Sequence, residues 1–254
     1  MNTVNVSRRR LLQTSAVTGG GLVVGLAFTG CSRRPAALPI ASTEGAWTPN
    51  AFLQILPDNT IRFYTARSEM GQGVTTGLAT LVGEELDVDP IDMDIRLAGA
   101  HEDYVNPAFG MQGTGGSSSI RGHYMHLRQV GANTRGLILE AAATDLGASA
   151  SALSTDNGFV LHSGKRYPYA AFVETARSLS IEADAPLKPA SQFLYIGQET
   201  KRVDAIAKAT GTAEFGIDVE VPGMHYAVVV RTPVAGARAL SVNAESAKAM
   251  PGVI

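Results

Sequence analysis

Residues 69–76 have the sequence EMGQGVTT, and they mark the change from a strand-like pattern to a helix-like pattern. Before them, residues 51–56 and 60–64 are rich in β-forming side chains and are separated by a turn at 57–59, which predicts a hairpin. After them, apolar residues between 78 and 86 recur with helical spacing. The stretch therefore predicts a glycine-containing loop between a strand and a helix.

Further along the chain, strand and helix patterns continue to alternate. Residues 93–97 alternate apolar and polar side chains, which predicts a half-buried strand. The loop over 98–116 is long enough to suggest a functional role. Residues 117–147 predict a long helix with serines as candidate N-caps, in which Gly131 and Gly136 indicate bending or close packing. This order of elements predicts an α+β fold with α/β layers.

The sequence of the second half of the chain predicts shorter helices and strands, and the start of a second domain. Residues 181–200 contain Pro186 and Pro189 and are expected to form an interdomain linker. The chain stops within a strand-like pattern, so we expect a second domain that is incomplete in this sequence. The expected elements are a hairpin over 159–168, a helix over 169–179, strands over 212–221 and 224–231, and a short helix over 244–249.

Composition excludes several classes of protein. Of the 254 residues, 45% are hydrophobic and 17% are charged, which argues against a disordered chain. The single cysteine excludes an internal disulfide framework and a cysteine-held zinc or iron–sulfur cluster on this chain alone. The net charge of -2 gives no indication of nucleic-acid binding.

The first residues differ from the rest and predict a targeting segment. Residues 1–43 contain arginines but no acidic residue, and Arg8, Arg9 and Arg10 precede an apolar run over 17–30. That run is shorter than the roughly 20 residues that span a bilayer. The pattern resembles a twin-arginine export signal, with a membrane-anchor helix as the alternative. We expect a signal peptide over 1–34 followed by a linker over 35–50.

Cys31 lies where this signal peptide is expected to end. The Thr29-Gly30-Cys31 sequence resembles a lipoprotein processing site, although Phe28 stands where such sites usually have leucine. Two outcomes remain open: the thiol receives a lipid, or it is removed with the signal. The expected location is the periplasm or the outer face of the inner membrane, with a possible lipid anchor at Cys31.

Two glycine-rich clusters are candidates for ligand binding. Gly71, Gln72 and Gly73 would let backbone amides approach an anionic or electron-rich ligand, and the Gln72 amide can both donate and accept. The alternative for this cluster is a simple tight turn.

The second cluster runs into the predicted long helix. It consists of glycine and hydroxyl residues, an arrangement suited to phosphate or pterin binding at a helix N-terminus, and the alternative is a flexible loop with an N-cap. It lacks the lysine of a P-loop. Its candidate residues are Thr114, Gly115, Gly116, Ser117 and Ser118.

Other polar residues give weaker signals. The acidic run from Glu84 to Asp94 is expected to be a solvated helix end and loop. His123 and His126 are expected to face solvent or to be capped, because no further metal ligands have suitable spacing. No catalytic triad is indicated, and no metal site is predicted.

Several short segments together form a pattern that is shared with a known family. They are Glu69–Thr76, Thr114–Ser119, Leu127-Arg128, Ala141–Ala143, Gly197-Gln198, Lys208–Gly211, Phe215–Asp218, Pro222–Met224 and Ala249–Val253. In these segments the chain resembles the molybdopterin-binding large subunit of the xanthine dehydrogenase and aldehyde oxidase family, in the branch that contains the isoquinoline 1-oxidoreductase β-subunits. The turn residues of the later part recur in order and resemble the start of that family's α/β hammerhead domain.

The resemblance implies a domain order and a cofactor. It places the first part of a molybdopterin-binding domain over 51–180, a linker over 181–200 and a truncated hammerhead domain over 201–254. It implies a molybdenum–molybdopterin cytosine dinucleotide cofactor, with Gln72 and its glycines near the metal end and Thr114 to Ser119 at the pterin or its phosphates.

The resemblance also implies the hydroxylation of N-heterocycles or aldehydes with oxygen taken from water. The implied partners are a 2Fe-2S small subunit, an electron acceptor such as a cytochrome, and the small-molecule substrate. The family's catalytic glutamate belongs to a C-terminal segment absent from this sequence, so the catalytic residues are unknown and this fragment is expected to be inactive. The competing hypothesis is a non-enzymatic exported lipoprotein with a ligand-binding cleft.

Overall fold

The computed structural model describes residues 40–254, and its first two strands form the expected hairpin. Strand β1 (Leu53–Ile55) pairs antiparallel with β2 (Ile61–Thr65), so that Leu53 lies opposite Phe63. Both side chains are fully buried. The expected targeting segment, including Cys31, lies outside the described residues.

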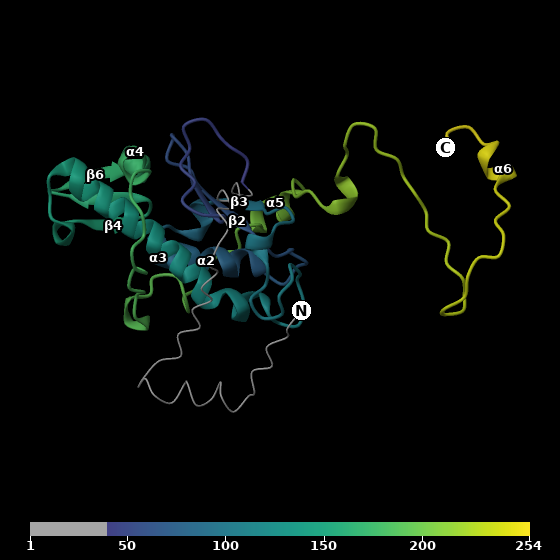
Figure 1. The fold of residues 1–254 in the computed structure, drawn as a ribbon, viewed down its shortest axis with the longest axis horizontal. Coiled ribbons are helices and arrows are strands. Elements are labelled where there is room, and N and C mark those ends of the chain that lie inside the picture. The colour runs from purple at the N-terminus through teal and green to yellow at the C-terminus, as the bar shows by residue number, and fades with distance from the viewer. Residues whose placement is uncertain (1–39) are drawn as a thin grey trace, which may run out of the picture.

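Helix α2 (Val74–Leu86) follows the hairpin and carries the chain back to β3 (Asp94–Leu97), as the sequence predicts. Strand β3 runs parallel to β2, which completes a three-stranded sheet in the order β1-β2-β3. The turn of residues 69–73 therefore lies at the carboxyl end of β2, directly before α2. In Figure 1, α2 lies beside this sheet.

Helix α3 (Ser119–Leu146) is the longest element and packs along α2 (Figure 1). The predicted close packing at Gly131 is confirmed, because an added Cβ there would lie 2.5 Å from the Val82 carbonyl oxygen. Gly136 lies in a looser position, where the nearest atom to an added Cβ is Ala185 Cβ at 3.6 Å. Glycine thus brings the two helix backbones close together at one point.

A second three-stranded sheet lies at the far end of α3 (Figure 1). The predicted hairpin is confirmed as β5 (Phe159–His162) and β6 (Lys165–Pro168), which pair antiparallel. Strand β4 (Ser154–Asp156) pairs with β5 and is not predicted by the sequence, because its three polar residues carry no strand pattern. The expected helix after β6 forms as a 3-10 turn leading into α4 (Val173–Ala176).

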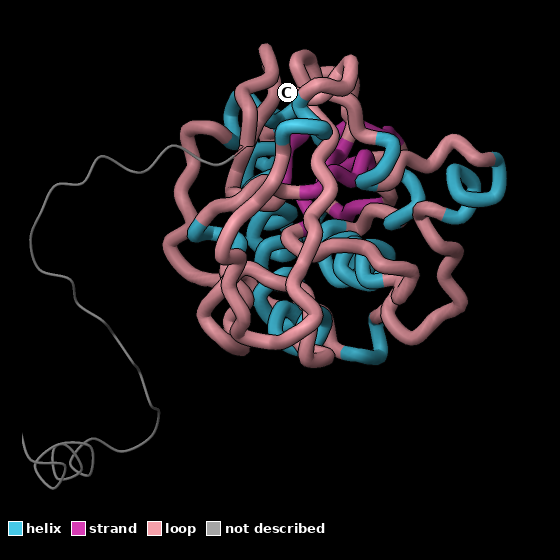
Figure 2. The backbone as a smooth tube through the Cα atoms, turned by 90° about the vertical axis from the view of Figure 1, so that its right-hand side faces the viewer, coloured by secondary structure: helices cyan, strands magenta, loops and turns pink. Residues whose placement is uncertain are grey.

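Short 3-10 helices connect many of these elements. They are η1 (Pro90–Asp92), η2 (Glu102–Tyr104), η3 (Ala150–Ala152), η4 (Tyr169–Phe172), η5 (Ala190–Gln192) and η6 (Gly216–Asp218). Much of the backbone nearest the viewer in Figure 2 is loop.

The acidic run at the end of α2 is not solvated, so that expectation is wrong for its first members. Glu84 and Glu85 are fully buried, and Asp87 is nearly so. The Glu85 carboxylate accepts from Arg128 Nε at 2.8 Å, and Asp87 pairs with Arg135 and Lys188. A buried carboxylate requires such compensation, and here cations far away in the sequence supply it.

Residues 184–204, which we name the strap, run back over α2. They coincide with most of the expected linker, yet they are held tightly. The Glu84 carboxylate accepts from the amides of Leu194, Tyr195 and Ile196 at 2.8–3.0 Å. The amide of Lys188 donates to Glu85 Oε2 at 3.0 Å. The segment is therefore part of the packed body.

The strands expected over 212–221 and 224–231 do not form in this structure. The segment holds η6 and extended backbone, between α5 (Ala205–Thr210) and α6 (Glu245–Lys248). No residue from 211 to 254 is buried, and the segment extends away from the body in Figure 1. A strand forms only when a neighbouring strand accepts and donates its hydrogen bonds, and the described residues offer none to this segment.

Candidate functional site

The two glycine-rich clusters come together in space. The amide of Ser68 donates to Thr114 Oγ1 at 2.9 Å, which joins the loop before α2 to the loop before α3. Between them lies a cavity of about 430 Å³. It is lined by Met70, Gln72, Gly73, Val74, Gly77, Thr114, Gly115, Ser117, Ser119 and Ile120.

Five of the eight residues predicted to bind a ligand line this cavity. Gln72, Gly73, Thr114, Gly115 and Ser117 line it, whereas Gly71, Gly116 and Ser118 lie in the same loops but outside the lining. Two loops that are distant in the sequence therefore share one hollow. The role of these residues toward a cofactor stays a prediction.

The loop before α2 owes its shape to glycines and to Glu69. Gly71 has a φ of 97° and Gly73 has a φ of 80°. Residues other than glycine rarely adopt such positive φ angles, because their Cβ atom clashes with the backbone. The Glu69 carboxylate accepts from the amides of Gly71 and Gly73, both at 2.9 Å, and from Thr75 at 3.1 Å. Burial opposes ionisation of Glu69, but these backbone donors outweigh it and lower the pKa of Glu69. An internal anion thus occupies the N-terminus of α2.

Gln72 is folded back onto its own loop. Its Oε1 accepts from the amide of Met70 at 2.5 Å, and its Nε2 donates to the Ser68 carbonyl oxygen at 3.0 Å. The side chain is exposed at the cavity and not packed in the core. Rotation about its side-chain bonds would present the amide to a ligand without disturbing the core.

The strap ends at this same loop. Arg202 Nη1 donates to the Gly71 carbonyl oxygen at 3.0 Å, and its Nη2 lies 3.3 Å from Glu69 Oε1. Asp204 accepts from both Arg202 Nε and Nη2 at 2.9 Å, which fixes the guanidinium. Residues about 130 positions apart in sequence therefore stabilise one loop, a contact that no local pattern predicts.

The loop before α3 is ordered by hydrogen bonds within itself. Ser118 occupies the N-cap position but makes no side-chain cap; its hydroxyl donates to the Gly115 carbonyl oxygen at 2.7 Å. Asn106 Nδ2 donates to Ser118 Oγ at 2.8 Å, and Ser117 has φ 52. The first amides of α3 have no partner within the helix, so they can receive an anion.

A buried arginine lies behind the first turn of α3. Arg67 is 1% exposed and donates to the carbonyl oxygens of Ala66 and Tyr104 and to His123 Nε2. The expectation that His123 faces solvent is wrong, because His123 is also 1% exposed. Burial and then the nearby Arg67 charge lower the pKa of His123 to about 4. The sequence carries no signal for this pair.

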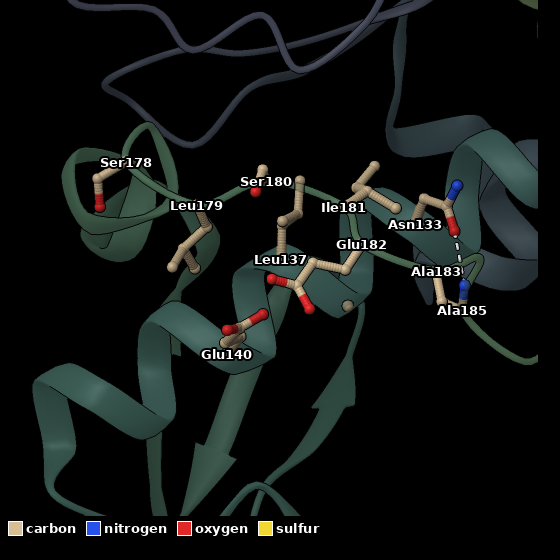
Figure 3. A pocket seen from close by; sticks show the side chains of 11 residues that line it. Asn133, Leu137, Glu140, Ser178, Leu179, Ser180, Ile181, Glu182, Ala183 and Ala185 are labelled. Atoms are coloured by element: carbon tan, nitrogen blue, oxygen red, sulfur yellow. Dashed lines mark hydrogen bonds between the residues drawn. The ribbon is translucent and has the colours of Figure 1, made fainter.

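A second hollow lies between α3 and residues 178–185 (Figure 3). It has about 450 Å³, and the carboxylates of Glu140 and Glu182 approach it from opposite walls. Asn133 Oδ1 accepts from the amide of Ala185 at 2.8 Å at its edge (Figure 3). Its acidic lining suits an anionic ligand poorly, so the cavity between the glycine loops is the stronger candidate.

The described part of the chain offers neither a cluster of metal ligands nor a membrane-spanning helix. Between residues 40 and 254, no three His, Cys, Asp or Glu side chains are grouped so as to bind a metal ion. Over the same residues, no helix combines the length and the apolar character needed to cross a bilayer.

Curated relatives align with nearly the whole chain. The beta chain of the isoquinoline 1-oxidoreductase of Brevundimonas diminuta is 31% identical over 99% of this chain and 36% of its own length. The membrane-bound aldehyde dehydrogenase of Gluconacetobacter polyoxogenes, whose name specifies pyrroloquinoline quinone, is 32% identical over 98% of this chain and 32% of its own length. One of the subunits of the nicotinate dehydrogenase of Pseudomonas putida is 30% identical over 80% of this chain and 18% of its own length.

The chain spans about a third of the length of the first two of these relatives. A family model described as "Molybdopterin cofactor-binding domain" matches residues 3–231. This match confirms the resemblance drawn from the two glycine-rich clusters and the later turn residues. The chain therefore belongs to the molybdopterin cofactor-binding domain family, as part of a molybdenum-binding subunit of the xanthine dehydrogenase family.

Proposed function

We propose that the cavity between the glycine loops binds part of a molybdenum–molybdopterin cofactor, in its cytosine dinucleotide form. The observation that carries the proposal is the convergence of Gln72 and Thr114 on one hollow of about 430 Å³. Pockets of this size accommodate small organic ligands. Apolar walls from Met70, Val74 and Ile120 suit a flat heterocycle, and hydroxyls beside them suit its polar edge.

The two loops fit such a ligand in different ways. The hydroxyls of Thr114 and Ser117 and the first amides of α3 are available as donors toward phosphate or pterin oxygens. The amides of Gly71 and Gly73 already donate to Glu69, so this loop contributes shape and the Gln72 amide. When bound, the cofactor would supply oxidation chemistry; these residues would orient it.

For the whole protein we propose the hydroxylation of an N-heterocycle or aldehyde with oxygen derived from water. The names of the relatives, which include isoquinoline and nicotinate enzymes, support this substrate class. Electrons would leave through a 2Fe-2S subunit to an acceptor such as a cytochrome. The single cysteine of this chain is consistent with a separate iron–sulfur subunit.

We also propose that the protein is exported across the inner membrane as a folded, cofactor-loaded unit, with a possible lipid at Cys31. The arginines at 8–10 and the apolar run over 17–30 support export. Cell fractionation of Arg8→Lys/Arg9→Lys against wild type tests it, and accumulation of both in the periplasm would contradict it. Incorporation of labelled palmitate in wild type but not in Cys31→Ser would show the lipid.

The cofactor proposal is tested on the product of the complete reading frame, purified with its partner. Elemental analysis is expected to find molybdenum in stoichiometric amount, and acid hydrolysis is expected to release a pterin and cytidine monophosphate. A quinone with no molybdenum would contradict the proposal. Absence of metal, pterin and quinone would favour the non-enzymatic lipoprotein.

Gln72→Ala tests the role of the loop before α2. Turnover is expected to fall at least about tenfold, because a cofactor contact is lost, while the melting temperature stays within about 2 °C. Gln192→Ala is the matched control, since Gln192 is exposed on η5 and lies outside the cavity lining. Equal turnover of Gln72→Ala and wild type would remove Gln72 from the site.

A further inference from the structure

The loop before α2 has two sides, and each side borders a hollow of its own. Gln72 lines the cavity between the glycine loops, whereas Gly71 does not. Gly71 and Asp204 instead line a separate hollow of about 630 Å³, which we name the outer hollow. Met70 borders both spaces. The peptide group that joins Gly71 to Gln72 therefore lies between the cavity and the outer hollow.

Arg202 holds this peptide group from the side of the outer hollow. Its Nη1 donates to the Gly71 carbonyl oxygen at 3.0 Å, and Arg202 does not line the cavity. Every peptide bond of residues 40–254 is trans, and in a trans peptide the carbonyl and the N–H point in opposite directions. Because the Gly71 carbonyl is turned to Arg202, the Gln72 N–H is turned to the other side of the loop, where the cavity lies.

The backbone N–H of Gln72 is available to a ligand. The amides of Met70, Gly71 and Gly73 are all used within the loop, by the side chains of Gln72 and Glu69. Within residues 40–254, no group accepts a hydrogen bond from the Gln72 N–H. The loop thus presents one unused backbone donor, and such a donor selects a ligand atom that carries a lone pair.

Arg202 also compensates the negative charge of the loop. Its Nη2 lies 3.3 Å from Glu69 Oε1, and its hydrogen bonds to Asp204 raise the pKa of the guanidinium. Lys208 Nζ lies 2.5 Å from Asp204 Oδ2. Two carboxylates therefore face two cations, and an electron-rich ligand atom meets no uncompensated negative charge at this loop.

The contribution of Arg202 increases when Gln72 turns toward a ligand. The Gln72 side chain bonds to the Met70 amide and the Ser68 carbonyl oxygen, and both bonds are lost if it rotates into the cavity. Gly71 lacks a Cβ atom and tolerates a wide range of backbone angles, so its peptide group can then rotate. The bond from Arg202 to the Gly71 carbonyl oxygen remains and opposes that rotation.

We propose that Arg202 is a positioning residue that fixes the Gly71-Gln72 peptide with its N–H, and not its carbonyl oxygen, toward the cavity. This side of the cavity then takes a hydrogen-bond acceptor, such as a carbonyl oxygen or an unprotonated ring nitrogen, and disfavours a donor. The inference rests on the proposed function, because the acceptor atom would belong to the ligand of the same cavity. A residue of the strap, about 130 positions along the chain, thereby decides which polar group the loop presents.

The test uses the two Gly-Gln pairs of the chain, at 71–72 and 197–198. Labelling glycine with ¹³C at its carbonyl and glutamine with ¹⁵N limits a triple-resonance spectrum of the 254-residue chain to these two peptide groups. Gln198 is the internal reference, because its N–H donates to the Tyr195 carbonyl oxygen at 3.2 Å. In wild type the Gln72 N–H is expected to exchange with water at least about threefold faster than the Gln198 N–H.

Three variants test the part played by Arg202. Arg202→Gln is expected to shift the Gly71 carbonyl signal and to broaden or double the Gln72 amide signal, while the Gln198 signal stays unchanged. Arg202→Lys keeps a cationic donor and is expected to restore a single Gln72 signal. The matched control is Arg166→Gln on β6, which removes the same charge and breaks an exposed ion pair with Asp156, and it is expected to leave both signals unchanged.

The consequence for the reaction is measured on the product of the complete reading frame, purified with its partner. Arg202→Gln is expected to lower turnover about tenfold at unchanged molybdenum content, because one oriented hydrogen bond is lost. Arg202→Lys is expected to recover most of that loss. A residue that served only folding would lower the molybdenum content and turnover together.

Several outcomes would overturn the proposal. They are an unchanged Gln72 signal in Arg202→Gln, an equal change in Arg166→Gln, equal turnover of Arg202→Gln and wild type, and a Gln72 N–H that exchanges as slowly as that of Gln198 in wild type. The last measurement needs no variant, so it decides the matter even if Arg202→Gln fails to fold. The spectra are recorded without cofactor, which separates them from the molybdenum and pterin analysis that decides the proposed function.

Discussion

At the residue scale, Glu84 shows how a charge can hold the body together. Its carboxylate is fully buried and accepts three consecutive strap amides, and Lys188 Nζ lies 3.3 Å from its Oε1. The negative charge is matched on every side by donors. Neutralising it leaves buried donors without an equivalent acceptor, which is more costly than losing an ordinary surface charge.

Glu84→Gln is therefore expected to lower the free energy of unfolding by about 3 kcal/mol. The side-chain amide of the glutamine would place its NH2 group against two other hydrogen-bond donors, the backbone amide of Leu194 and the Lys188 ammonium group. Urea denaturation measures the change, with Glu174→Gln as control because the side chain of Glu174 is 92% exposed. Loss of less than about 0.5 kcal/mol in Glu84→Gln would show that the strap is held by other contacts.

The same carboxylate predicts a dependence of stability on pH. Burial opposes ionisation of Glu84, but amides of the strap outweigh it and lower its pKa from the ordinary value of 4.5. A lowered pKa in the folded state contributes stability above the unfolded value, and that stability is lost as the pH falls through the folded value. The difference in stability between wild type and Glu84→Gln should therefore shrink as the pH falls below the ordinary value of 4.5. A constant difference in calorimetry would contradict this.

Side chains such as Glu84 and Arg67 mark the limit of what the sequence predicts about the site. Gly71 and Gly73 are identifiable because a positive φ is a local requirement, read from a few neighbouring residues. The partners of Glu84 and Arg67 lie far along the chain, at Lys188 and His123. An acidic run looks the same in sequence whether water or a distant lysine compensates it.

At the element scale, the contact between α2 and α3 depends on Gly131. An added Cβ there would lie 2.5 Å from the Val82 carbonyl oxygen and 3.1 Å from Glu85 Cβ. These are backbone and near-backbone atoms, which cannot move away without separating the helices. Gly136, on the same helix, has room for a methyl group.

Gly131→Ala is expected to destabilise the protein by about 2 kcal/mol, despite the better helix propensity of alanine. Gly136→Ala is expected to be neutral or to stabilise by up to about 1 kcal/mol, because only the propensity changes. Thermal unfolding of both variants beside wild type gives the comparison. Equal effects at the two positions would mean that the helices are not in close contact at Gly131.

Elements with strong local patterns are predictable from the sequence, and elements that depend on partners are not. Helices α2 and α3 and both hairpins follow from periodicity and turn residues. Strand β4 has no such pattern and exists because β5 pairs with it. The strand patterns over 212–221 and 224–231 show the reverse, since an apolar pattern forms no strand without a neighbour.

At the scale of the whole molecule, the described chain divides into a packed body and an exposed segment. The strap joins the end of α2 to the glycine loop, through Glu84 at one end and Arg202 at the other. Beyond residue 211 nothing is buried, and Val228 and Val230 are both more than nine-tenths exposed. Cooperative stability therefore comes from residues before 211, because burial is concentrated there.

Limited trypsin digestion should follow this division. Within residues 40–254, cleavage at Arg231 and Arg238 is expected early, because both lie on exposed backbone, whereas Arg67 and Arg128 are buried and should resist. Mass spectrometry of the time course gives the order of cuts, and calorimetry of the trimmed product should give a melting temperature within about 2 °C of the intact chain. A clear drop in that temperature, or simultaneous cuts inside α3, would show that the segment after 211 packs on the body in solution and covers apolar surface there.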